Sequence, residues 1–150
     1  MTIRAYIDIA RPDHWFKNIF MIPGILLCIF FHPESRHHIQ YFSILLGFIG
    51  ACLVASSNYV INEILDAPRD RHHPVKKNRP IPSGQVNISM AYVEWLGLGL
   101  AGLLCGFIIS HAMGYTLLAL WIAGLAYNVP PVRTKDKPYL DVLSESINNP

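Results

Sequence analysis

Four long apolar stretches alternate with shorter polar stretches along the 150-residue chain. The apolar stretches run from about Trp15 to Phe31, from Gln40 to Leu65, from Ile88 to Ser110 and from Ala112 to Val129. A helix needs roughly 20 mostly apolar residues to cross a bilayer. The pattern therefore predicts an all-α protein, a bundle of four transmembrane helices. Lys17 lies near the start of the first stretch, where its long side chain can reach the lipid headgroups.

A much shorter apolar pattern precedes the first stretch. Ile3, Tyr6, Ile7 and Ala10 recur at helical spacing ahead of Pro12. This spacing predicts a short helix that lies in the membrane interface and ends before the proline.

Small residues form stripes along two of the predicted spans. The second span carries Ser43, Gly47, Ala51 and Ala55, and the third carries Gly97, Ala101, Gly102 and Gly106. Small side chains allow the close backbone approach by which membrane helices associate. The stripes therefore predict a tightly packed bundle.

The composition agrees with a membrane protein, because hydrophobic residues make up 52% of the chain and charged residues only 15%. This balance excludes an ordinary soluble domain. We expect residues 1–150 to form a single integral membrane domain, with the lipid bilayer and no nucleic acid among its partners.

The cations are distributed unevenly between the two ends of the predicted spans. Of the twelve Lys and Arg residues, only Arg36 lies at one end, and the other eleven lie at the opposite end. Positively charged loops stay in the cytoplasm. We therefore expect the N-terminus and the polar loops to face the cytoplasm of a bacterial-type inner or cell membrane.

A polar stripe stands at the cytoplasmic end of the second span. Asn58, Asn62, Asp66 and Asp70 recur every four residues, a spacing that places side chains along one helix face. Carboxylates are costly at membrane depth and so indicate function. Oxygen ligands that include carboxylates suit Mg²⁺, which usually shares them with substrate phosphates. The stripe predicts a site for magnesium and diphosphate.

Prolines are expected to shape the region that follows the stripe. Pro68 should end or kink the helix near Ala67, which would place Asp70 on a turn. The next loop is stiffened by Pro74, Pro80 and Pro82 and carries cations that suit phosphate oxygens, namely Arg69, Arg71, Lys76, Lys77 and Arg79. We expect this loop to fold over the site.

Several segments of the chain resemble the UbiA superfamily of intramembrane prenyltransferases. The resemblance rests on Asn62 to Asp70 (NEILDAPRD), Arg79 to Gly84 (RPIPSG) and Tyr127 to Lys135 (YNVPPVRTK). Glu63 stands where the family usually has Asp. A further segment, Arg11 to Asn18 (RPDHWFKN), is more similar to the branch that transfers phosphoribose onto polyprenyl phosphate.

The resemblance implies a fold and a set of site residues. The chain corresponds to about half of a nine-helix bundle, that is, to an incomplete prenyltransferase domain whose C-terminal half is missing. Mg²⁺ is the implied cofactor, with Asn62, Asp66, Asp70, Asp141 and Glu145 as its ligands. The implied catalytic residues are Asp66, Asp70, Arg79 and Lys135. The implied substrate-binding residues are Lys17, Asn18, Asn58, Arg69, Arg71, Lys77, Arg79, Tyr127 and Lys135.

The resemblance also implies a reaction, the displacement of Mg²⁺-bound diphosphate from carbon. A prenyltransferase would join the chain of an isoprenoid diphosphate to an acceptor. The alternative branch would transfer phosphoribose from phosphoribosyl diphosphate to polyprenyl phosphate. Two other functions remain open, a non-catalytic half-bundle and a small transporter, although a transporter would favour acids near the membrane midplane.

Overall fold

The computed structural model describes residues 2–31, 33 and 41–137, and among these residues it contains helices and no strand. The α-helices are α1 (Ile3–Ala10), α2 (Met21–Phe31), α3 (Tyr41–Asp70), α4 (Ile88–Ile109) and α5 (His111–Asn128). Three 3₁₀ helices accompany them: η1 (Pro12–Phe20), η3 (Lys76–Asn78) and η4 (Thr134–Asp136). The predicted all-α fold is confirmed.

Three helical stretches of the described chain are long and apolar enough to cross a membrane: Ile3–Phe31, Tyr41–Asp70 and Ile88–Ile109. The first combines α1, η1 and α2, and so extends further than the predicted span. The fourth predicted span is helical, as α5, but polar residues at both of its ends leave it outside this group. Length and composition thus support an integral membrane protein with one such span fewer than predicted.

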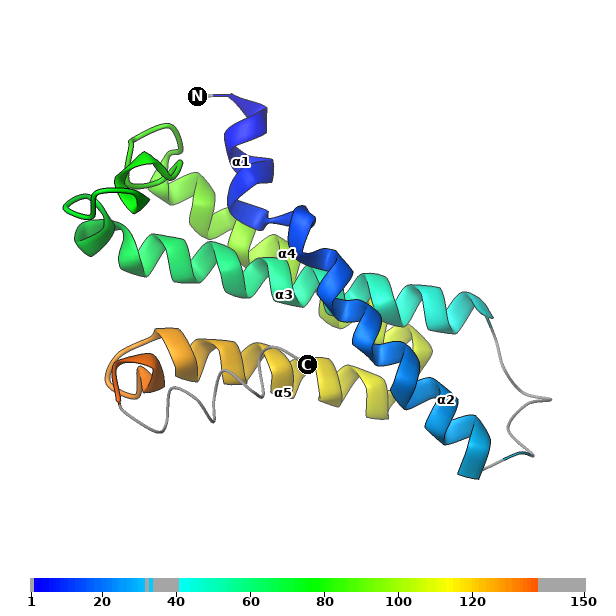
Figure 1. Ribbon diagram of the computed structural model, residues 1–150. Helices are drawn as coiled ribbons and strands as arrows, with labels where there is room; N and C mark the ends of the chain where they lie inside the picture. Colours follow the sequence, from blue (N-terminus) through cyan, green and yellow to red (C-terminus); the bar gives the residue numbers. More distant parts are fainter. Residues whose placement is uncertain (1, 32, 34–40, 138–150) are drawn as a thin grey trace.

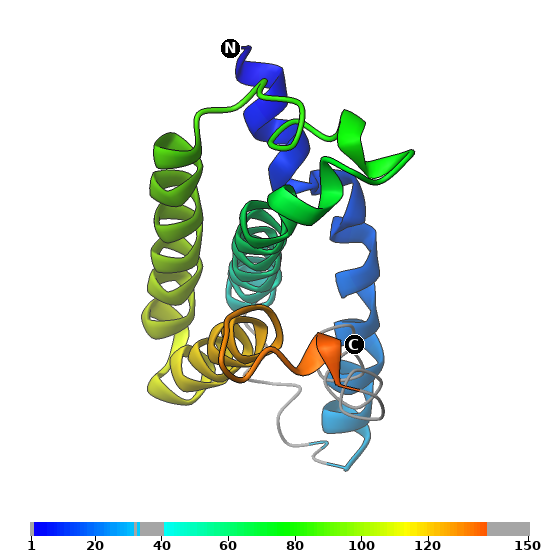
Figure 2. The ribbon, with the colours of Figure 1, turned by 90° about the vertical axis from the view of Figure 1, so that its left-hand side faces the viewer.

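Helix α3 is the centre of the bundle and contacts α1, η1, α4 and α5. Figure 2 looks nearly along α3, with α4, α5 and the η1–α2 segment arranged around it. In Figure 1, α5 runs beside α3, and both helices end at the same end of the bundle. This arrangement brings the residues after α5 close to the C-terminal end of α3.

Glycines permit the close approach of α3 to α4. A Cβ atom added at Gly102 would lie 2.8 Å from the carbonyl oxygen of Gly50, closer than packed atoms tolerate. The predicted packing role of Gly102 is therefore confirmed, and Gly50 joins it. Gly106 has a packing role too, but against α5, because a Cβ there would lie 3.0 Å from the Cα atom of Gly114. The prediction is wrong for Gly97, because a Cβ there meets nothing within 4 Å. The predicted stripe of small residues thus extends beyond the helix contact, onto the exposed face of α4.

The N-terminal segment is fastened along α3. Ala5 and Ile9 of α1 are buried in a cluster with Val60 and Ile64, whereas Ile3 remains 82% exposed. The predicted short helix is thus confirmed, with one face against the bundle. Beyond it, Trp15 Nε1 donates a hydrogen bond of 2.9 Å to Ser56 Oγ, and Asn18 Nδ2 lies 3.1 Å from Cys52 Sγ.

Helix α3 continues through Pro68 to Asp70, so the prediction that the helix ends near Ala67 and leaves Asp70 on a turn is wrong. Inside a helix, proline removes the backbone bond to the carbonyl four positions earlier and crowds that carbonyl with its ring. Pro68 lies in the last turn and is exposed, where one lost bond interrupts little of the helix. The backbone N–H of Arg71 still donates to the carbonyl of Ala67 at 3.1 Å.

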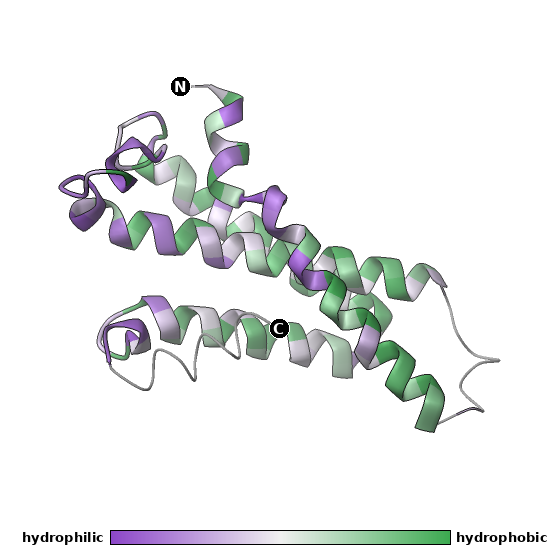
Figure 3. Ribbon diagram, in the orientation of Figure 1, coloured by the Kyte–Doolittle hydropathy of each residue, from purple (hydrophilic) through white to green (hydrophobic). Residues whose placement is uncertain are grey.

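Polar residues gather at one end of the bundle. In Figure 3 they cover the C-terminal end of α3, the loop of residues 71–87 and the segment of residues 129–137. The opposite ends of α2, α3 and α4 are apolar. The fold therefore places the chemically active side chains on one side of the molecule.

Candidate functional site

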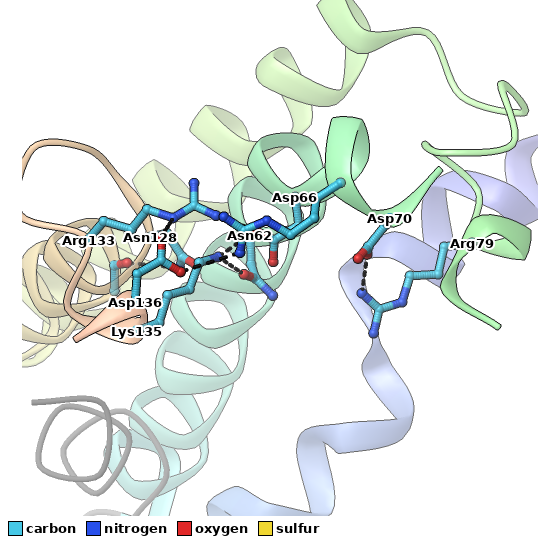
Figure 4. Close-up of polar contacts among 10 residues, drawn as sticks. Asn62, Asp66, Asp70, Arg79, Asn128, Arg133, Lys135 and Asp136 are labelled. Carbon is cyan, nitrogen blue, oxygen red and sulfur yellow. Dashed lines mark hydrogen bonds and ion pairs between the residues drawn. The ribbon is translucent and has the colours of Figure 1, made fainter. Parts of the chain in front are cut away.

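Lys135 lies at the centre of the polar end of the bundle. Its ammonium nitrogen Nζ donates to Asn62 Oδ1 at 2.8 Å, Asp66 Oδ1 at 2.7 Å and Asn128 Oδ1 at 3.1 Å. We call these three oxygens the oxygen cradle. Figure 4 shows Lys135 reaching from η4 between α3 and α5 to meet them. The cradle thus joins α3 to the end of α5 and to η4, which lie about 70 residues later in the sequence.

Three further residues, Arg133, Asp136 and Arg69, form a charged group beside the oxygen cradle. Arg133 donates from Nη2 to the same Asp66 Oδ1 at 2.9 Å and pairs through Nε with Asp136 Oδ2 at 2.7 Å. Arg69 lies 3.4 Å from the other oxygen of Asp136. Arg133 adopts a positive φ of 30°, and this backbone bend precedes η4, which carries Lys135 and Asp136. The result is a compact group of alternating charges.

The surroundings shift the pKa values of two of these groups. Burial lowers the pKa of the Lys135 ammonium, although the hydrogen bond and charge of Asp66 oppose that effect. The hydrogen bond from Arg69 is the main cause that lowers the pKa of Asp136, and Arg133 acts in the same direction. Asp136 therefore stays ionised as the counter-charge between the two arginines.

Asp70 does not contribute to the oxygen cradle. Its Oδ2 accepts a hydrogen bond of 2.8 Å from Arg79 Nη1, and the Asp70 side chain is only 6% exposed. Figure 4 shows this pair apart from the group around Lys135. Glu63 is buried as well, and its Oε1 accepts the backbone N–H of Ile81 at 3.1 Å. Both carboxylates fasten the loop of residues 71–87 to α3.

A cavity of about 510 Å³ lies between η1, the start of α2, α3 and α5, with the oxygen cradle at one end. Its lining changes along the helices: Ala51, Ala55, Met113, Leu117 and Leu120 come first in α3 and α5, and Asn58, Asn62, Tyr127 and Asn128 come later. Asn58 Oδ1 is buried there and has no hydrogen-bond partner among the described residues. The cavity is mostly apolar, with Asn18 and Thr116 as polar exceptions, and its other polar residues gather toward the end near the cradle.

Of the other predicted site residues, some line the cavity and others lie away from it. Asn18, Asn58 and Tyr127 line the cavity. Lys17 is partly buried on η1, and Arg71 and Lys77 are exposed on the loop. Asp141 and Glu145 lie outside the described residues.

Sequence reasoning missed Asn128, Arg133 and Asp136. The first two belong to the same YNVPPVRTK segment that provided Tyr127 and Lys135. The segment contained a signal for them, because an amide and a guanidinium beside a predicted phosphate-binding lysine are suitable partners for oxygen anions and cations.

The oxygen cradle has the chemistry of a divalent-cation site that a substrate completes. Among the described residues, no three His, Cys, Asp or Glu side chains gather as a metal site. The cradle instead offers one carboxylate oxygen and two amide oxygens around a single point. Mg²⁺ takes oxygen ligands and is commonly held by one or two carboxylates together with substrate phosphates and water. The residues therefore fit Mg²⁺ bound jointly with a diphosphate.

The fold and the site define a helical membrane protein with an apolar cavity that ends in a group of oxygen ligands and cations. The chain belongs to the UbiA prenyltransferase family, whose sequence model matches residues 20–147. Membership agrees with the transferase class that the sequence motifs imply.

Relatives of this chain carry names of three kinds. Decaprenyl-phosphate phosphoribosyltransferase of Mycolicibacterium smegmatis is 34% identical over 102 residues, which are 68% of this chain and 30% of the relative. Protoheme IX farnesyltransferase of Cronobacter sakazakii is 30% identical over 128 residues, or 85% of this chain and 40% of the relative. The nodulation protein NoeC of Azorhizobium caulinodans is 32% identical over 83 residues, or 55% and 25%. The chain spans well under half the length of these relatives.

Proposed function

We propose that this chain provides the diphosphate-binding part of a UbiA-type membrane transferase that moves phosphoribose from phosphoribosyl diphosphate to a polyprenyl phosphate. The observation that carries the proposal is the oxygen cradle at the polar end of an apolar cavity. One end of this arrangement suits a diphosphate with its cation, and the other end suits a lipid chain.

Each group at the polar end has a defined task in the proposed site. Asn62, Asp66 and Asn128 would hold Mg²⁺, which when bound supplies a Lewis acid that neutralises charge on the leaving diphosphate. Lys135 and Arg133 would donate hydrogen bonds to phosphate oxygens, a stabilisation that grows as negative charge develops there. Asp70 and Arg79 would act indirectly, by holding the adjacent loop in place.

The proposed reaction breaks the bond between the anomeric carbon of phosphoribosyl diphosphate and its diphosphate oxygen. A phosphate oxygen of the polyprenyl phosphate forms the new bond to that carbon, and diphosphate leaves with the bonding electron pair. The nucleophile is already an anion, so no side chain has to remove a proton. The apolar walls of the cavity, with Leu117 and Leu120 among them, would keep water from capturing the carbon centre.

The choice of branch is supported by similarity. The names of several relatives specify decaprenyl-phosphate phosphoribosyltransferase activity for those proteins. The farnesyltransferase relatives support a second candidate, transfer of a prenyl group from its diphosphate to an acceptor. The same cation and diphosphate site would serve both reactions.

The polar end of the bundle faces the cytoplasm in this proposal. Its loop of residues 71–87 carries four of the twelve Lys and Arg residues, and positively charged loops stay on the cytoplasmic side. Substrates soluble in water would then reach the site directly, and the lipid substrate would reach it from the bilayer.

The test is product formation in membranes that contain this chain. One reaction receives radiolabelled phosphoribosyl diphosphate with polyprenyl phosphate, and the other receives labelled prenyl diphosphate with aromatic or haem acceptors. Asp66→Asn removes the cradle carboxylate, and Asp8→Asn, a matched change at an exposed position of α1, serves as the control.

We expect a Mg²⁺-dependent labelled lipid in the first reaction, lost with Asp66→Asn and retained with Asp8→Asn. Labelled product in the second reaction alone would overturn the phosphoribosyl assignment in favour of prenyl transfer. Absence of product in both reactions would overturn activity of this chain by itself and leave a non-catalytic half-bundle or a small transporter.

A further inference from the structure

We propose that the Lys135 ammonium and a divalent cation bind the oxygen cradle alternately, so that Lys135 must leave Asn62, Asp66 and Asn128 before it can bind a phosphate. The inference rests on the proposed function for the identity of the anion, a diphosphate. It adds two things to the proposed function. Lys135 occupies the cation position while the cation is absent, and Asn128 becomes a cation ligand, a role that the sequence motifs do not assign.

The first argument is the number of donors. An ammonium group has three N–H donors and no acceptor. In the structure Nζ of Lys135 has three acceptors, at 2.7, 2.8 and 3.1 Å. All three donors are therefore used by the oxygen cradle. Lys135 cannot donate to a phosphate oxygen unless it releases at least one of these three partners.

The second argument is the shared position. Mg²⁺ binds oxygens at about 2.0–2.1 Å, and the point from which all three cradle oxygens can be reached is the point that Nζ holds. Two cations cannot occupy it together. Arg133 increases the competition, because it donates at 2.9 Å to the same Asp66 Oδ1 that Lys135 binds.

The third argument is charge. The group contains the cations Arg69, Arg133 and Lys135 and the anions Asp66 and Asp136, and three cations less two anions leave a charge of +1. A divalent cation arriving alone would meet a site that is already positive. A diphosphate arriving with it reverses that balance and also accepts the donors that Lys135 and Arg133 release. The divalent cation should therefore bind far better together with diphosphate than alone.

The side chain of Lys135 is suited to such an exchange. It is 10% exposed, so the ammonium is held away from bulk water, yet its four-carbon stem is flexible and its charge is a single point. An arginine fork in its place would need a planar pair of acceptors. One residue can thus hold the cradle oxygens in place and then move to the phosphate bound beside them.

The experiment measures binding of Mn²⁺ to the full chain in detergent micelles, by electron paramagnetic resonance of the free ion, with and without inorganic diphosphate. The test variants are Lys135→Met and Lys135→Gln, of which the second retains a hydrogen-bond donor. The control is Lys137→Met, which removes the same charge from an exposed position two residues away.

We expect both Lys135 variants to bind Mn²⁺ alone about tenfold more tightly than the wild type. The substitution removes the repulsion between the lysine charge and the metal ion, and a modest repulsion of this kind corresponds to about that factor. Lys137→Met should stay within about threefold of the wild type, because that charge lies outside the cradle. Diphosphate should strengthen Mn²⁺ binding in the wild type and strengthen it less in the two Lys135 variants.

Equal Mn²⁺ affinity of the wild type and both Lys135 variants would overturn the proposal. Tightening by Lys137→Met as large as that by Lys135→Met would also overturn it, since the effect would then be one of general charge. The outcome is separate from the transfer reaction. Product formation without the change in Mn²⁺ affinity would leave the proposed function standing and the alternation refuted.

Discussion

Asp66 and Asp70 lie one helical turn apart on α3, yet their carboxylates bind different cations from different segments. Asp66 binds Lys135 and Arg133, which follow α5, and Asp70 binds Arg79 of the loop after α3. From this division we expect a ligand-binding role for Asp66 and a structural role for Asp70. Each of these roles can be tested separately.

The Asp70–Arg79 pair is expected to stabilise the loop of residues 71–87. Replacing Asp70 by Ala leaves the Arg79 guanidinium without its 2.8 Å partner, which should lower the free energy of unfolding by about 1.5–3 kcal/mol, the range for hydrogen bonds to charged groups. Chemical unfolding in micelles measures the change. A double-mutant cycle with Arg79→Ala should be strongly non-additive, and purely additive losses would show that the two side chains act independently.

Glu63 is expected to hold the same loop through its backbone. Glu63→Ala leaves the buried N–H of Ile81 without an acceptor, at a cost of about 1–3 kcal/mol, whereas Glu63→Gln keeps an oxygen in place. Limited trypsin digestion reports the effect, since Arg71, Lys76 and Lys77 are exposed on the loop. We expect faster cleavage with Glu63→Ala than with Glu63→Gln, and equal rates would argue against this anchor.

The close approach of α3 and α4 predicts a difference between two glycines of α4. Gly102→Ala places a methyl group 2.8 Å from the Gly50 carbonyl oxygen and should destabilise the fold by about 1–3 kcal/mol through overpacking. Gly97→Ala meets open space and should stabilise the helix by up to about 1 kcal/mol. Thermal unfolding in micelles gives both values. Similar shifts for the two variants would contradict the observed helix contact.

The cavity predicts a distinct effect on the lipid substrate. Ala55 lines it, and Ala55→Phe would fill part of the space without touching the oxygen cradle. We expect weaker binding of polyprenyl phosphate, by about tenfold or more for an overfilled apolar pocket, with Mn²⁺ and diphosphate binding unchanged. Ala101→Phe on the exposed face of α4 is the size-matched control. Equal affinity of the two variants for the lipid would place the lipid elsewhere.

Asn128 is expected to contribute to cation binding. Asn128→Ala removes one of the three cradle oxygens and should weaken joint binding of Mn²⁺ and diphosphate about tenfold, the effect typical of a lost partner at a metal site. Asn78→Ala removes an amide from an exposed position of η3 that belongs to neither the cavity nor the cradle and should leave that binding unchanged. If both variants weaken binding to the same extent, the assignment of Asn128 fails.

The sequence allowed the helices and part of the site to be predicted, for identifiable reasons. Apolar runs of sufficient length specify helices in a membrane, and spacing by four correctly placed Asn62 and Asp66 on one face. The cation that each carboxylate binds could not be predicted from the spacing of residues along the chain. Lys135 and Asp66 are 69 residues apart, and their contact depends on where the segment after α5 returns.

Two failures of prediction have simple physical causes. Pro68 was expected to break α3, but a single missing N–H in the last turn does not prevent the remaining backbone bonds from forming. The stripe of small residues on α4 was extended to Gly97, although the contact with α3 occupies only the part around Gly102. Local patterns describe what a residue permits, and packing decides which of these possibilities is used.

Because Lys135 contacts α3, the segment of residues 129–137 can be regarded as a ligand of the cradle that is covalently attached to the protein. Its effective concentration at the cradle is set by the short connection to α5, so in the proposed exchange a divalent cation from solution competes with a tethered ammonium. We expect a dissociation constant measured for the divalent cation to report the difference between two binding free energies. The intrinsic affinity of the cradle oxygens for that cation would then be stronger than the measurement shows.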